Sequence, residues 1–168
     1  LIKESYFPRW KAYVNGEDLK AREGMALASF YAGFAFSRAL LGYVHGIAHQ
    51  FGGFYGTPHG MANALVLPHI LDYSRDAASA KLAKLARAIG LDDGESDDLK
   101  LAQMFIDKVY ELRAKVGIPN TLSNLKEHDI PNIAKAAIKE SHASYPVPRY
   151  MDSKTCEGII HKLLPNGN

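Results

Sequence analysis

Residues 39–71 read ALLGYVHGIAHQFGGFYGTPHGMANALVLPHIL, and these 33 residues contain no Asp, Glu, Lys or Arg. The chain has 168 residues and 38 charged side chains, so all of its charge lies in the other 135 residues. We expect the uncharged run in the protein interior, because burying an unpaired charge is costly. It is not a predicted membrane span, because glycine, proline and histidine interrupt the roughly 20 apolar residues that a span requires.

Amphipathic helices are predicted on both sides of this run. Apolar side chains recur every three or four residues in five segments: 17–39, 78–89, 97–116, 130–140 and 152–164. The first segment loses its polar residues toward its C-terminal half, which we expect to be buried on nearly all sides. A further helix is predicted over 1–14, interrupted at Pro8, and a loop over 143–149. No strand pattern occurs, so the prediction is a single all-α, multi-helix domain covering residues 1–168.

Composition excludes several classes of function. A net charge of +2, without any block of five like charges, gives no footprint for nucleic acid or an anionic membrane. The single cysteine, Cys156, excludes an internal disulfide framework and favours a reducing compartment, so we expect a cytoplasmic protein. The chain starts at Leu1, without an initiator methionine or a signal-peptide pattern. We therefore expect it to be part of a longer protein.

Histidines carry the chemistry of the uncharged run. His45 and His49 are four residues apart, which places both rings on one face of a helix. A glycine-rich turn and Pro58 precede His59, the predicted start of the next helix, and can bring His59 back toward that pair. Three neutral imidazoles that converge in an uncharged interior would suit a divalent metal. His69 is expected to be structural, whereas His128 and His161 lie beside charged residues and are expected to be solvated.

Two other interpretations remain open at this point. The histidines could be hydrogen-bonded core residues of a non-catalytic helical binding domain, without any metal. They could also belong to a metallohydrolase, but a zinc protease helix carries a glutamate base directly after its first histidine, and Gly46 stands there in this chain. The uncharged run supplies no carboxylate at all, which disfavours a hydrolase that works through a local carboxylate.

The segment GYVHGIAHQFGGFYGTPHG, residues 42–60, closely resembles the signature of the iron-dependent (group III) alcohol dehydrogenases. The likeness continues through MANALVLPH (61–69), upstream through AREGM (21–25) and AGFAF (32–36), and downstream through VGIP (116–119). The resemblance implies a dehydroquinate synthase-like all-α domain that follows an α/β dinucleotide-binding domain, with the active site between them. This chain resembles the all-α half alone.

The resemblance also implies roles for individual histidines. His45 and His59 correspond to two ligands of a metal that is usually iron and sometimes zinc. His49 corresponds to a histidine near the nicotinamide and the reacting alcohol, a candidate for positioning or proton relay. From their places in the chain, we expect Phe36 and His142 to line the substrate pocket.

The same resemblance predicts which parts are absent. No Asp-x-x-x-His segment precedes His45 and no glycine-rich phosphate loop occurs, so the chain has half a metal site and almost none of the NAD or NADP site. The expected function of the complete protein is the interconversion of a small alcohol and its aldehyde or ketone. The expected partners are the N-terminal nucleotide-binding domain and further copies of the chain, with neither nucleic acid nor membrane. The 168-residue chain alone is expected to be inactive.

Overall fold

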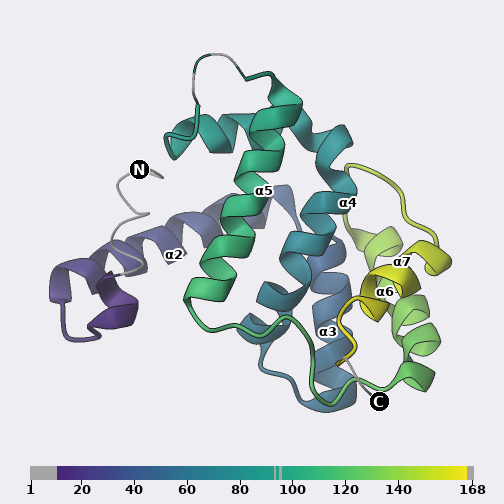
Figure 1. The fold of residues 1–168 in the computed structure, drawn as a ribbon. Helices are drawn as coiled ribbons and strands as arrows, with labels where there is room; N and C mark the ends of the chain where they lie inside the picture. The colour runs from purple at the N-terminus through teal and green to yellow at the C-terminus, as the bar shows by residue number, and fades with distance from the viewer. Residues whose placement is uncertain (1–10, 93, 95, 166–168) are drawn as a thin grey trace. The chain divides into compact units, whose positions relative to one another are not determined.

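A computed structural model of the chain describes residues 11–92, 94 and 96–165, and within these ranges every regular element is a helix (Figure 1). The prediction of an all-α fold is confirmed. Residues 11–14 are helical, whereas the rest of the helix predicted over 1–14 lies outside the described residues. The main elements are α2 (Leu19–Ala39), α3 (Tyr43–Tyr55), α4 (His59–Ala88), α5 (Asp98–Lys115), the short 3-10 helix η1 (Glu127–Asp129), α6 (Ile130–Ser144) and α7 (Ser153–His161).

Helix α4 is longer than the sequence pattern predicts. The segment 78–89 was expected as a separate helix, but it forms the C-terminal part of one 30-residue helix that starts at His59. Pro68 lies inside α4 and is buried. Proline removes one helical N–H donor, which normally ends or kinks a helix. In this chain the helix continues past Pro68. Val66 and Ile70, two residues to either side of the proline, are both buried.

The helices form two units, and each unit is made of two separate stretches of the chain. One unit contains residues 41–78 and 106–168, and the other contains residues 1–40 and 79–105. In the first unit α3 packs against α6, and α6 packs against α7. The core of this unit is built from fully buried apolar side chains on these helices, on the first half of α4 and on the segments that flank α7: Tyr43, Ile47, Phe51, Leu65, Ile133, Met151, Ile160 and Leu163.

A close approach of two backbones fixes the packing of α3 on α6. A Cβ atom added at Gly46 would lie 3.1 Å from the carbonyl oxygen of Ala137 and would overlap the hydroxyl of Ser141. Both Ala137 and Ser141 are completely buried. Only glycine therefore fits at this position of α3 without moving α6 away.

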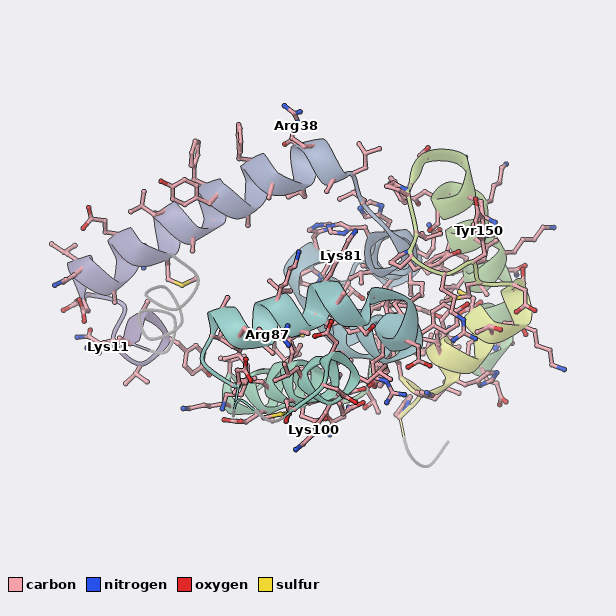
Figure 2. All side chains as sticks on the ribbon, turned by 90° about the horizontal axis from the view of Figure 1, so that it is seen from above. Lys11, Arg38, Lys81, Arg87, Lys100 and Tyr150 are labelled. Atoms are coloured by element: carbon pink, nitrogen blue, oxygen red, sulfur yellow. The ribbon has the colours of Figure 1, made fainter. Side chains whose placement is uncertain are left out.

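The second unit has a small core and several exposed ion pairs. Ala83 and Ala86 of α4 pack on Leu101 of α5. At the end of α4, Arg87 lies 3.2 Å from Asp92 and 2.9 Å from Asp98, and its side chain is labelled in Figure 2. These pairs are solvent-exposed, so solvent screens them and they contribute little to stability.

Helix α2 corrects one sequence-based expectation. Its N-cap is Asp18, whose carboxylate accepts a hydrogen bond from the backbone N–H of Ala21, and Arg38 in the last turn complements the helix dipole (Figure 2). The C-terminal half was expected to be buried, but Ala21 is the only buried residue of α2. Phe30 and Phe34 are 66% and 67% exposed. The apolar pattern of this helix therefore marks a surface rather than a core.

The described helices differ in length and apolar character. No single helix among them is both long enough and apolar enough to cross a membrane, and only α2 and α3 taken together across the break between them satisfy these criteria. Helix α3 owes its apolar character to core residues, since Tyr43, Ile47 and Phe51 are buried.

We predict that Gly46→Ala destabilises the chain by about 1–3 kcal/mol, because the added methyl group must push α6 away from α3. Gly53→Ala in the same helix is the matched control. A Cβ at Gly53 meets nothing within 4 Å, so this substitution should be neutral or stabilising by up to about 1 kcal/mol. Urea denaturation of the three proteins measures the difference, and equal midpoints for the two variants would contradict the close packing of α3 on α6.

We predict that the isolated 168-residue chain self-associates through α2. Leu27, Phe30, Tyr31 and Phe34 are spaced by three and four residues and form one exposed apolar stripe on the helix. Phe30→Ser combined with Phe34→Ser should shift the chain toward monomer in sedimentation velocity at constant concentration. A doubly substituted chain that associates as strongly as the unmodified one would show that the stripe is not the contact.

Candidate metal centre

The turn between α3 and α4 brings three histidines together. Helix α3 ends at Gly56, whose left-handed φ of 63° suits a residue without a side chain, and α4 starts three residues later at His59. The ring centroid of His59 lies 5.3 Å from that of His45 and 5.5 Å from that of His49. The rings of His45 and His49, on adjacent turns of α3, are 5.7 Å apart. The three imidazoles therefore form a nearly equilateral triangle within one unit of the fold.

This cluster opens to solvent more than the sequence predicted. The uncharged run was expected in the interior, but His45 and His49 are only half-buried and His59 is exposed. The opposite side of α3 faces the core, with Ile47, Ala48 and Phe51 buried. The lack of charge in the run thus reflects two different surroundings, a core-facing side of α3 and a histidine-bearing side that solvent reaches.

The surroundings of His45 favour the neutral form of its imidazole. Partial burial lowers the pKa of His45, and protonated His49 and His59 would lower it further by repulsion, whereas the charge of Glu140 opposes the shift. A neutral imidazole retains a nitrogen lone pair, which is the form that binds a metal ion.

A ligand set made of these histidines is incomplete. Among the described residues, no group of three or more His, Cys, Asp or Glu side chains is arranged to hold a metal ion. In addition, the side-chain nitrogen of Asn63 lies 3.1 Å from Nε2 of His59 and donates to the His59 carbonyl oxygen at 2.9 Å. The donor type still fits, because imidazole nitrogen suits both iron and zinc. The triangle of rings therefore fits part of a metal site.

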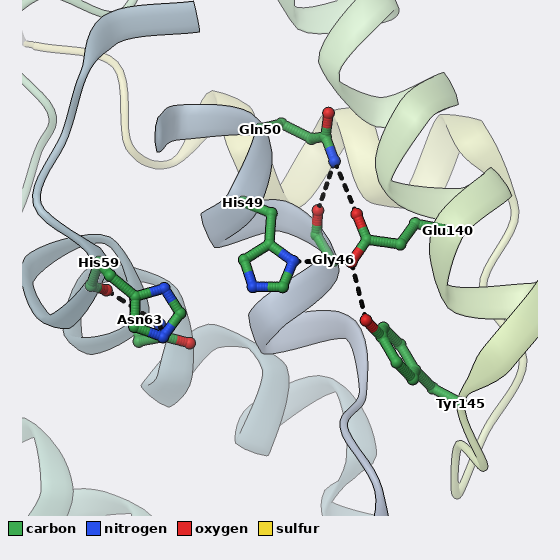
Figure 3. A network of polar contacts seen from close by, with 7 residues as sticks. All are labelled: Gly46, His49, Gln50, His59, Asn63, Glu140 and Tyr145. Carbon is green, nitrogen blue, oxygen red and sulfur yellow. Dashed lines mark hydrogen bonds and ion pairs between the residues drawn. The ribbon is translucent and has the colours of Figure 1, made fainter. Parts of the chain in front are cut away.

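A carboxylate that the sequence analysis did not anticipate lies beside His49. Oε1 of Glu140, on α6, is 2.7 Å from Nδ1 of His49, although 91 residues separate them in the chain (Figure 3). The sequence analysis did not identify this residue as a neighbour of the histidines. The uncharged run supplies none, but the packing of α6 on α3 brings one from a distant segment. No local sequence signal pairs these two residues.

The two predicted pocket residues lie in different units. His142 is exposed on α6, with Nε2 2.8 Å from the hydroxyl of Tyr43 and its ring 5.2 Å from that of Tyr150. Phe36 lies on α2 in the other unit, and its side chain is 53% exposed. Both assignments to a substrate pocket stay predictions.

Comparisons with known proteins identify the family. Residues 6–164 match the family described as "Fe-containing alcohol dehydrogenase family, C-terminal". The chain belongs to the Fe-containing alcohol dehydrogenase family. It is 44% identical over 156 residues to a 1,3-propanediol dehydrogenase of Citrobacter freundii, an alignment that covers 92% of this chain and 40% of that protein. An NAD-dependent methanol dehydrogenase of Bacillus methanolicus is 37% identical over 142 residues, covering 83% of this chain and 36% of that protein.

A solved structure of this family shows the same fold. The crystal structure of a 1,3-propanediol oxidoreductase superposes with a TM-score of 0.85 at 38% identity, covering 91% of this chain and 40% of that one. The chain thus spans about 40% of the length of these members of the Fe-containing alcohol dehydrogenase family. Membership confirms the resemblance inferred from residues 42–60.

His69, which was expected to be structural, has surroundings that disfavour its protonated form. Its Nδ1 lies 3.4 Å from the hydroxyl of Tyr110, and its buried Nε2 has no hydrogen-bond partner among the described residues. Burial lowers the pKa of His69, Arg113 and Lys162 lower it further by repulsion, and Asp72 opposes them. The folded chain therefore favours the neutral form of His69.

We predict that the chain loses stability as pH falls below about 6.5, the ordinary histidine pKa, because the unfolded chain then binds a proton that folded His69 resists. The contribution of His69 is at most about 1.4 kcal/mol per pH unit and ends at its lower folded pKa. Urea denaturation between pH 7.5 and 5 measures it. His69→Gln should flatten the dependence, whereas His161→Gln, at an exposed position, should not; an unchanged slope in His69→Gln would contradict the assignment.

Proposed function

We propose that the chain is the metal-binding part of an NAD(P)-dependent alcohol dehydrogenase that interconverts a small alcohol and its aldehyde or ketone. The observation that carries this proposal is the convergence of His45, His49 and His59 at ring separations of 5.3–5.7 Å. The names of the relatives, which act on propanediol and methanol, support a short alcohol or diol as the substrate class.

His45 and His59 are the proposed ligands of an iron or zinc ion. When bound, such an ion acts as a Lewis acid that polarises the alcohol or carbonyl oxygen of the substrate. The incomplete ligand set of the described residues is consistent with further ligands from a part of the protein outside this chain. His59 must turn away from Asn63 if it is to use Nε2 as the ligand atom.

The other proposed residues of this chain bind and orient the substrate. His49 lies beside both proposed ligands and presents one ring nitrogen as a polar contact for the substrate hydroxyl. Phe36 and His142 are the candidate pocket residues, an apolar and a polar contact. The protein excludes water and fixes the position of the substrate. The hydride chemistry itself belongs to the nicotinamide.

The cofactor site is proposed to lie mostly outside this chain. The NAD-dependent methanol dehydrogenase supports a nicotinamide cofactor in general, and the relatives are more than twice as long as the aligned segment. An N-terminal nucleotide-binding domain is thus the main proposed partner, and the active assembly is proposed to be a homo-oligomer. Without that domain, the 168-residue chain should not oxidise an alcohol with NAD+ or NADP+.

We predict that His45→Ala and His59→Ala each reduce metal content and lower kcat/KM of the longer protein by more than about 100-fold. This exceeds the about 10- to 100-fold loss that is typical when residues around the metal ligands are changed. The matched control is His128→Ala, since the side chain of His128 is 76% exposed and lies on η1 rather than on α3 or α4, the two helices that carry the cluster. Elemental analysis and steady-state kinetics provide the two measurements.

Unchanged metal content and turnover in both His45→Ala and His59→Ala would refute the ligand assignment. The competing interpretation, a non-catalytic helical binding domain with structural histidines, predicts no bound metal and no effect of a chelator. Treatment of the longer protein with a chelator, followed by re-addition of ferrous iron or zinc, separates the two, because only the dehydrogenase should lose and regain turnover.

A further inference from the structure

Glu140 is the centre of a hydrogen-bond network that the proposed function does not use. Its Oε1 lies 2.7 Å from Nδ1 of His49 and accepts a hydrogen bond from the hydroxyl of Tyr145 at 2.9 Å. Its Oε2 accepts a hydrogen bond from Nε2 of Gln50 at 3.0 Å. The side chains of His49 and Glu140 are 36% and 29% exposed, so solvent only partly screens the network. Figure 3 shows these donors gathered around one carboxylate.

The chemistry of the partners fixes the polarity of this network. Nε2 of Gln50 also donates to the carbonyl oxygen of Gly46 at 3.1 Å, so both amide hydrogens of Gln50 are used. The reversed amide would place an oxygen opposite two acceptors, which excludes that orientation. An ionised carboxylate only accepts hydrogen bonds, and therefore Nδ1 of His49 must carry a hydrogen.

A hydrogen on Nδ1 determines what the other ring nitrogen of His49 can do. A neutral imidazole has one N–H donor and one acceptor nitrogen, so Nε2 is then the acceptor. Nε2 points away from Glu140, on the side where His59 lies (Figure 3). The carboxylate thus sets both the tautomer and the direction of the ring.

We propose that Glu140 is a positioning residue for His49: it holds the hydrogen on Nδ1 and presents an unprotonated Nε2 on the open side of the histidine cluster. The value of this arrangement rests on the proposed function, in which that nitrogen accepts a hydrogen bond from the hydroxyl of an alcohol. Gln50 and Tyr145 contribute by fixing the carboxylate, one from α3 and one from the end of α6.

A purely structural role for Glu140 makes a different prediction. If Glu140 only tied α6 to α3, then its replacement would change stability and leave the tautomer of folded His49 as it was. Stability therefore cannot discriminate between these roles, but the protonation pattern of the imidazole nitrogens can. This pattern is measured by nitrogen-15 NMR of the histidine rings, with His49 assigned from the His49→Gln spectrum.

The first experiment uses the 168-residue chain at a pH at which His49 is neutral. The unmodified chain should show the Nδ1–H tautomer of His49. In Glu140→Gln the ratio of Nδ1–H to Nε2–H should fall at least about tenfold, because the amide cannot satisfy all three donors as the carboxylate does. Glu140→Asp, which keeps the charge on a shorter side chain, should give an intermediate ratio. The control Glu127→Gln, an exposed glutamate of η1, should match the unmodified chain.

An Nε2–H tautomer in the unmodified chain, or an unchanged ratio in folded Glu140→Gln, would overturn the proposal. If Glu140→Gln does not fold, the Glu140→Asp chain decides, and an unchanged ratio there overturns it as well. These measurements need neither metal nor turnover, so they separate a failure of this inference from a failure of the proposed dehydrogenase function.

The second experiment uses the longer protein loaded with metal. Glu140→Gln should lower kcat/KM by about 10- to 100-fold, as is typical for a residue that orients a functional histidine, while the metal content stays that of the unmodified protein. Glu140→Asp should restore part of the loss, and Glu127→Gln should have full activity. Full activity of Glu140→Gln would overturn the positioning role.

Discussion

The contact of α3 with α6 at Gly46 is the constraint on which the histidine cluster depends. Gly46 approaches Ala137 and Ser141 so closely that a residue with a side chain does not fit at this position between the two helices. Residues three or four positions farther along each helix lie on the same side as these contacts. His49 and Gln50 follow Gly46 by that interval, and Glu140 follows Ala137, so the helix contact itself brings the imidazole, the amide and the carboxylate into hydrogen-bonding distance.

A second constraint acts through the short connection between α3 and α4. The turn residues 56–58 reverse the chain within three positions, with Gly56 in a left-handed conformation. His59 is therefore held at the first residue of α4 and meets two histidines of the preceding helix. Since both helices are anchored by core residues such as Phe51 and Leu65, the separations within the cluster are set by a packed core. Binding and catalytic geometry benefit from such rigid support.

Local sequence patterns predicted most of the fold but not the pairing at the site. Helical spacing identified α2, α5, α6 and α7 to within a few residues, because each has a cap, a glycine or a proline near its ends. The patterns predicted a helix start at His59 and a helix over 78–89, but not that both belong to one helix that continues through Pro68. The three-histidine cluster was predictable from spacing and a turn. Glu140 was not, because its neighbour His49 is 91 residues away and only tertiary packing connects them.

Helices α2 and α3 are similar in apolar content but differ in how far their apolar side chains are buried. Both helices are rich in apolar residues, yet Phe30 and Phe34 face solvent whereas Ile47 and Phe51 are fully buried. Composition alone cannot distinguish a core helix from an interface helix, because both exclude water once their partners are present. What distinguishes them is the partner: α3 packs on α6 in its own unit, whereas α2 has an apolar stripe without a comparable cover in the described residues.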